Sequence, residues 1–140
     1  MLQGDLYKLF LSILKFRKAI ENTEKSLLPL SFQKFPKGSS RETSWILAKY
    51  LQENGYGEFD FVFGSRGLHS HVWLQLDNLV VDITADEFED QKNKTIVVSN
   101  SEWHKMFNGQ VQQIATMEYY DQKTQTTLLN AYKVVIANIK

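Results

Sequence analysis

The chain of 140 residues contains no cysteine. Disulfide bonds and thiolate metal sites are therefore excluded. The absence of cysteine says little about the compartment in which the protein acts.

An excess of charge of either sign is also missing, because sixteen basic and sixteen acidic residues give a formal net charge of zero. A general nucleic-acid binder normally presents a basic face, so we do not expect nucleic acid as a partner. Hydrophobic residues make up 43% of the chain and charged residues 23%, as in an ordinary soluble globular protein. The length fits one domain with a proper core, and we predict a single domain over residues 1–140.

Long hydrophobic runs are absent from the N-terminal region, where the longest apolar stretch, Leu9–Leu14, includes Ser12. A membrane-spanning helix needs about 20 apolar residues, so we expect no membrane association of that kind. Basic residues bracket the stretch and no small-residue cleavage site follows it, which argues against a signal peptide. We therefore expect a cytoplasmic protein, or one delivered as an effector without a cleavable signal peptide.

Only two prolines occur, and both lie in residues 26–38, which we interpret as a connector without a long helix. Before it, apolar residues recur at helical spacing over residues 3–25, which predicts an amphipathic helix facing the core. A membrane-surface or partner-binding helix is the alternative on the same pattern. After the connector we predict a helix over residues 40–54 that ends at Gly55.

The middle of the chain is rich in aromatic and β-branched residues, which predict short strands. The predicted strands are 59–63, 69–76, 79–84 and 94–98. Residues 99–101 then cap a short helix, residues 110–120 are ambiguous between strand and loop, and a last helix begins near 121 or 124 and ends at 139. Helices at both ends of a run of antiparallel strands indicate an α+β fold, with the helices packed against a central sheet.

The start of the second helix has a pattern with chemical meaning. Ser39 followed three residues later by Glu42 fits a capping box with Ser39 as the N-cap. Ser40 then occupies the first helical position, at the positive end of the helix dipole. A cysteine there would have a lowered pKa and would be poised as a thiolate, whereas the dipole cannot bring an alcohol near ionisation at neutral pH. Serine is common at helix starts for capping alone, so this segment does not assign chemistry by itself.

A hairpin downstream adds a histidine and an aspartate. Asp77–Asn78 suits a two-residue turn. With that turn, side-chain alternation places on one face the residues His71, Trp73, Asp82 and Thr84. His71 and Asp82 are then diagonal neighbours about 7 Å apart at the backbone, a gap that an aspartate can close toward an imidazole. The carboxylate would fix the tautomer and leave the other ring nitrogen free as a base. A three-residue turn would instead put Asp82 on the opposite face.

These three segments together carry a resemblance. The order of a helix start, a histidine on a strand and an aspartate on the next strand resembles the transglutaminase-like and papain-like cysteine hydrolase superfamily. More closely, it is similar to a group of small bacterial proteins that read F-P-x-G-x-C, then H-A-W-L, then D-I-T-A-D-x-F. The matching segments are Phe35–Ser40, His71–Leu74 and Asp82–Phe88, and SEWHKMF at 101–107 is similar to the same group. The resemblance covers roughly residues 32–107 and implies a papain-like or transglutaminase-like fold.

The resemblance implies a Cys–His–Asp triad, with His71 as base, Asp82 as its orienter and a thiol where Ser40 stands. It implies acyl transfer on an amide of a protein or peptide, by a peptidase, amidase, deamidase or transglutaminase, with no cofactor. Serine at position 40 departs from the pattern through a natural loss, a true serine nucleophile or an introduced substitution, and we expect this form to be inactive or very slow. The alternative is a natural pseudoenzyme that binds a peptide or partner protein in the same cleft.

Two further residues are candidates for binding substrate. Trp73 either forms a wall of the substrate groove or packs against the helix that bears Ser40. Gln33, upstream of Ser40, is an oxyanion donor by resemblance to papain-like enzymes, although backbone amides at the helix start serve equally well.

A metal-dependent hydrolase is the second alternative. His69 and His71 alternate along one strand and so can face one ion, with Asp82 or Asp86 completing the ligand set. His104 is expected on a helix surface or in packing.

Overall fold

The computed structural model describes residues 3–114 and 120–140 of the chain. The helices in these ranges are α1 (Gln3–Asn22), α2 (Ser40–Glu53), α3 (Glu102–Lys105) and α4 (Gln122–Ile136). The strands are β1 (Asp60–Arg66), β2 (His69–Leu76), β3 (Leu79–Asp82), β4 (Ile96–Ser99) and β5 (Gln110–Ile114). Short 3-10 turns are η1 (Lys25–Leu27), η2 (Leu30–Phe32) and η3 (Ala85–Glu87). The predicted α+β class is confirmed; of the ambiguous segment 110–120, residues 110–114 form a strand and 115–119 lie outside the described residues.

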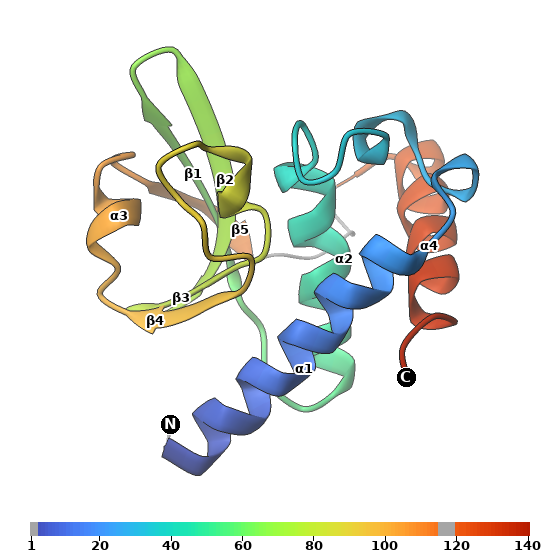
Figure 1. The fold of residues 1–140 in the computed structure, drawn as a ribbon, viewed down its shortest axis with the longest axis horizontal. Helices are drawn as coiled ribbons and strands as arrows, with labels where there is room; N and C mark the ends of the chain where they lie inside the picture. Colours follow the sequence, from blue (N-terminus) through green and yellow to red (C-terminus); the bar gives the residue numbers. More distant parts are fainter. Residues whose placement is uncertain (1–2, 115–119) are drawn as a thin grey trace.

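The five strands form one antiparallel sheet in the order β4-β3-β2-β1-β5 (Figure 1). Across the β2–β3 turn, Leu76 pairs with Leu79 and Leu74 with Val81, so the predicted two-residue turn is confirmed. Asp77 has a φ of 54°, the left-handed conformation that short-side-chain polar residues adopt in such turns. The register that brings His71 and Asp82 to one face follows from this turn.

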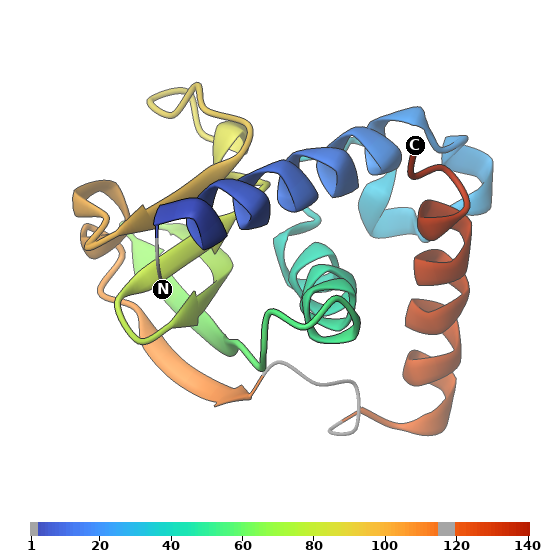
Figure 2. The same cartoon turned by 90° about the horizontal axis from the view of Figure 1, so that it is seen from below.

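Helices cover the two faces of the sheet unequally. Figures 1 and 2 show α1, α2 and α4 together on one side and only the short α3 on the other. The larger core lies on the helical side and includes Val72 and Leu74 of β2, whereas Trp73 belongs to a smaller core with Val62, Val80 and Phe107. Alternation along β2 therefore places His71 on the α3 side of the sheet, opposite the face that packs on α2.

Helix α1 faces the larger core, as predicted for the first segment of the chain. Its fully buried residues are Leu9, Ile13, Phe16 and Ile20. Among the described residues, none of the helices combines the length and apolar character that a bilayer crossing requires.

Helix α2 begins at Ser40 as predicted, but the predicted capping box does not form. The Ser39 hydroxyl donates to the carbonyl of Pro36 at 3.0 Å and accepts from the Thr43 hydroxyl at 3.2 Å. Ser39 has a ψ of 3° instead of the extended value typical of an N-cap, so its hydroxyl is not directed at the first free N–H groups of the helix.

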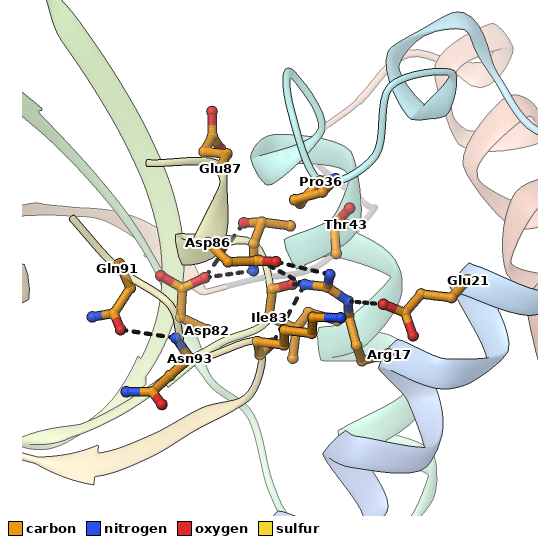
Figure 3. Close-up of polar contacts among 12 residues, drawn as sticks. Arg17, Glu21, Pro36, Thr43, Asp82, Ile83, Asp86, Glu87, Gln91 and Asn93 are labelled. Atoms are coloured by element: carbon orange, nitrogen blue, oxygen red, sulfur yellow. Dashed lines mark hydrogen bonds and ion pairs between the residues drawn. The ribbon is translucent and has the colours of Figure 1, made fainter. Parts of the chain in front are cut away.

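A buried arginine ties α1 to the segment that follows Asp82 (Figure 3). Arg17 is 3% exposed and donates to the carbonyl of Ile83 at 2.6 Å. It also binds both carboxylate oxygens of Asp86, at 2.7 and 3.0 Å. Asp86, one of the residues predicted as a possible metal ligand, is therefore an ion-pair partner of Arg17, as is Glu21 on the same helix at 3.1 Å. The chain leaving β3 is held against the helical side by this contact.

We expect Arg17→Met to lower the free energy of unfolding by about 3 kcal/mol, because Asp86 and the Ile83 carbonyl lose their buried partner. Urea denaturation measures the change. Lys18→Met is the matched control, since Lys18 is the exposed neighbour on the same helix. Equal stability of the two variants would contradict the role given to Arg17.

Candidate functional site

Two imidazoles share one buried carboxylate. Nε2 of His71 and Nε2 of His104 each lie 2.7 Å from Oδ2 of Asp82. The other carboxylate oxygen accepts from the backbone N–H of Thr84 at 2.9 Å and from its hydroxyl at 3.3 Å. The exposed fractions of His71, Asp82 and His104 are 0%, 2% and 2%. The predicted contact between His71 and Asp82 is present, and His104 joins it unpredicted.

The segment that contains α3 and Phe107 packs closely against β1 and shields this cluster from solvent. Gly64 pairs with His71 across the β1–β2 ladder, and a Cβ at Gly64 would lie 2.7 Å from the carbonyl oxygen of Phe107. The N–H of Ser65 donates to that same carbonyl at 2.7 Å. Glycine at 64 therefore permits the approach that covers His71.

Aromatic rings surround His71. Their centroids lie between 5.2 and 6.0 Å from that of the imidazole and belong to Phe88, Phe107, Trp73 and Trp103. The Arg66 guanidinium lies over three of these rings, at 4.8 Å from the Phe107 centroid, and forms a bidentate ion pair with Asp90. This enclosure excludes water from the ring of His71.

The charges of the cluster stabilise one another. Burial alone lowers the pKa of His71, but the charge of Asp82, its hydrogen bond and the nearby Glu87 outweigh burial and raise the pKa to about 9. Burial alone raises the pKa of Asp82, yet the charges and hydrogen bonds of His71 and His104 hold it well below its usual range. At neutral pH, His71 and Asp82 therefore form a buried imidazolium–carboxylate pair.

The second ring nitrogen of His71 is free. Its Nδ1 is buried and has no hydrogen-bond partner in the part of the chain that the structure describes. The closest acidic atom recorded is Oε2 of Glu87 at 3.5 Å, beyond the usual length of a hydrogen bond. An imidazole with one nitrogen held by a carboxylate and the other unpartnered has the arrangement of a general acid–base group.

Ser40 lines a pocket of about 440 Å³. Residues from the start of α2, the β1–β2 hairpin and η3 line it: Gly38, Ser40, Arg41, Glu42, Phe63, Leu68, His69, Ser70, Val72 and Glu87. His71 is not among the lining residues, so Glu87 is the side chain that both lines the pocket and approaches Nδ1 of His71. Burial raises the pKa of Glu42 in the same pocket.

The predicted substrate-binding residues lie elsewhere. Trp73 is 2% exposed and packs on the α3 side of the sheet, so it contacts neither α2 nor the pocket of Ser40. Strand alternation sends Trp73 and Val72 to opposite faces, and Val72 is the one that lines the pocket. The side-chain nitrogen of Gln33 donates to the carbonyls of Lys25, Leu28 and Pro29 in the connector. It is therefore not available to donate to an oxyanion.

Of the predicted metal ligands, the structure brings together only His71 and Asp82. His69 is exposed and lines the pocket of Ser40, whereas the ligand atoms that converge belong to His71, Asp82 and His104, all within 4.8 Å of one another. Two of their separations are 2.7 Å. Ligand atoms around one tetrahedral zinc ion lie about 3.3 Å apart, so the three side chains are spaced for hydrogen bonds.

His104 and Glu87 were missed because their roles depend on distant contacts. The sequence predicts His104 on a helix surface or in packing, and the structure shows it packed between Trp73 and Trp103. Its pairing with Asp82 and the position of Glu87 carry no local sequence signal of their own. Ser101, three residues before His104, is the nearby residue that indicates how the His104 ring is held. Its hydroxyl lies 2.6 Å from Nδ1 of His104 and accepts from the N–H of that residue. A serine cap followed three residues later by a histidine fixes the imidazole as well as the helix start.

Comparison with protein-family models, with curated proteins and with solved structures found no match to this chain. Function is therefore inferred from the residues and distances described above.

We expect the free energy of unfolding to fall as the pH rises from about 6.5 to about 9. The pKa of His71 is raised from its unfolded value of about 6.5 to about 9, so its contribution is complete below the first value and lost through the second. The loss is at most about 3 kcal/mol. Urea denaturation across this range measures it.

His71→Gln is the control for this pH dependence, and its free energy of unfolding should be nearly constant over the same pH range. A parent protein as flat as His71→Gln between pH 6.5 and 9 would show that the buried pair is not ionised.

On the acid side, the lowered pKa of Asp82 means that its contribution to stability is lost as the pH falls below about 3.9.

Proposed function

We propose that the pocket of Ser40 is the site of an acyl-transfer enzyme acting on an amide of a protein or peptide, with His71 as base and Asp82 as its orienter. The observation that carries this proposal is the buried His71–Asp82 pair at 2.7 Å, which leaves Nδ1 of His71 without a partner. Glu87 links that nitrogen to the pocket.

We further propose that the fold is a variant of the papain-like or transglutaminase-like fold. In support, α2 begins at Ser40 and packs on an antiparallel sheet in which β2 carries His71 and β3 carries Asp82. This is the chain order of nucleophile, base and orienter that the resemblance implies.

The reaction requires a thiol at position 40. A thiolate there would attack the amide carbonyl carbon, and the His71 imidazolium would give its proton to the leaving amine as the C–N bond breaks, leaving a thioester. Water or a second amine would then attack the thioester while His71 takes its proton, which returns the thiolate. The first N–H groups of α2 lack intrahelical acceptors and are the donors available to the oxyanion, since Gln33 is engaged elsewhere.

Three features of the present chain oppose this reaction, and the first is that His71 is fully buried and does not line the pocket of Ser40. Serine at position 40 cannot be ionised by a helix dipole at neutral pH, so the chain with Ser40 is expected to be inactive or very slow. Glu87 lies 3.5 Å from Nδ1, and we infer that its carboxylate turns away when His71 meets the nucleophile.

We expect Ser40→Cys to be alkylated by iodoacetamide well below the reference thiol pKa of about 8.5, because the His71 imidazolium stabilises the thiolate. The double variant Ser40→Cys/His71→Gln should lose this low-pH reactivity. The rate of alkylation between about pH 4 and 9 is the measurement, and each variant carries a single thiol because the chain has no cysteine.

Gln52→Cys is the matched control, since it places one thiol at an exposed position near the other end of α2. An ordinary pH profile for Ser40→Cys, indifferent to His71 and equal to that of Gln52→Cys, would contradict the enzyme. The pocket would then be tested as the peptide-binding site of a pseudoenzyme.

A further inference from the structure

Asp82 is oriented by more than His71. Its Oδ2 accepts equally short hydrogen bonds from His71 and His104, and Thr84 binds its Oδ1. A carboxylate that is 2% exposed needs its charge countered and its lone pairs satisfied. His104 supplies one of these hydrogen bonds from α3, an element that carries no other contact to Asp82 among the hydrogen bonds described.

Unlike His71, His104 has both ring nitrogens engaged. Nε2 binds Asp82, and Nδ1 lies 2.6 Å from the Ser101 hydroxyl. Ser101 accepts from the backbone N–H of His104 at 3.2 Å, so its hydroxyl hydrogen is free to point at Nδ1. The ring of His104 is also packed between Trp73 and Trp103, each with its centroid 4.9 Å away. His104 is thus held in one orientation with no nitrogen left for a substrate.

We propose that His104, backed by Ser101, is a positioning residue that holds the Asp82 carboxylate against His71 and so directs the free nitrogen of His71 toward Glu87 and the pocket. Its catalytic consequence rests on the proposed function of that pocket; its effect on His71 does not. Without the hydrogen bond from His104, Thr84 still binds Oδ1 of Asp82 but His71 alone holds Oδ2, so we expect the pairing of Asp82 with His71 to be less constrained.

The charged and titratable groups facing His71 come from four elements. They are Asp82 on β3, Glu87 on η3 and His104 on α3. Arg66 on β1 is the fourth, because its guanidinium lies over an aromatic ring that packs on His71. Among the described residues, His104 is the only side chain outside the hairpin and the turn after it that hydrogen-bonds the Asp82 carboxylate. Its substitution therefore changes the pairing of Asp82 and leaves Glu87 and Arg66 in place.

The test compares His104→Phe, which keeps a ring and loses the donor, with His104→Gln, whose side-chain amide can still donate to Asp82. NMR titration of the His71 imidazole in the parent chain background is the first readout. We expect the pKa of His71 to fall by about one unit or more in His104→Phe and to stay near the parent value in His104→Gln. Lys105→Gln, an exposed change on the same helix, is the control.

The Ser40→Cys background supplies the second readout. His104→Phe should shift the pH midpoint of alkylation upward by about one unit, His104→Gln should restore it, and Ser101→Ala should shift it less in the same direction. If His104→Phe does not fold, the Ser101→Ala titration of His71 decides the question, because it removes the backing and leaves both imidazoles in place.

A pKa of His71 that is unchanged or higher in a folded His104→Phe protein would overturn the proposal, since His104 would then compete for Asp82 instead of positioning it. A purely structural residue would lower stability without moving either readout. A thiol at position 40 that never responds to His71 would refute the proposed function, while the titration of His71 would still decide the role of His104.

Discussion

The site depends on one buried carboxylate. Asp82 accepts four hydrogen bonds, from His71, His104 and the backbone and side chain of Thr84, in a place that water does not reach. Burying a charge in this way is costly unless every lone pair is used and the charge is opposed. Asp82 meets both conditions by drawing β2, α3 and the turn after β3 onto the end of β3. Satisfying this one side chain therefore requires these four segments to meet at Asp82.

The surroundings of Asp82 are built to hold this arrangement from both sides of the sheet. On the helical side, Arg17 binds the Ile83 carbonyl and Asp86, so the chain leaving β3 is anchored to α1. On the other side, Gly64 lets the Phe107 carbonyl come close to β1, which brings His104 to the carboxylate. The His71–Asp82 ion pair lies beside the smaller core on the α3 side of the sheet, and the pocket lies at the start of α2 on the helical side.

Local sequence rules were sufficient to predict part of the fold and of the candidate site. The Asp77–Asn78 turn sets the β2–β3 register, and the register alone makes His71 and Asp82 neighbours. The start of α2 at Ser40 is also a local property. Local rules failed where another partner nearby in the chain competes. Ser39 bonds Pro36 and Thr43 in place of forming a capping box, and Gln33 donates to carbonyls of the connector in place of an oxyanion.

The sequence by itself determined the α+β class, the hairpin register and the pairing of His71 with Asp82, because each follows from periodicity or from a turn of two residues. Only the tertiary structure decided that His104 shares Asp82, that Glu87 approaches the free nitrogen of His71 and that Trp73 faces away from α2. The physical reason is that these contacts depend on which face of the sheet is covered by the segments that follow β3 and β4. That choice is made by burial over the whole molecule, through Arg17 and Gly64, and no short stretch of sequence contains it.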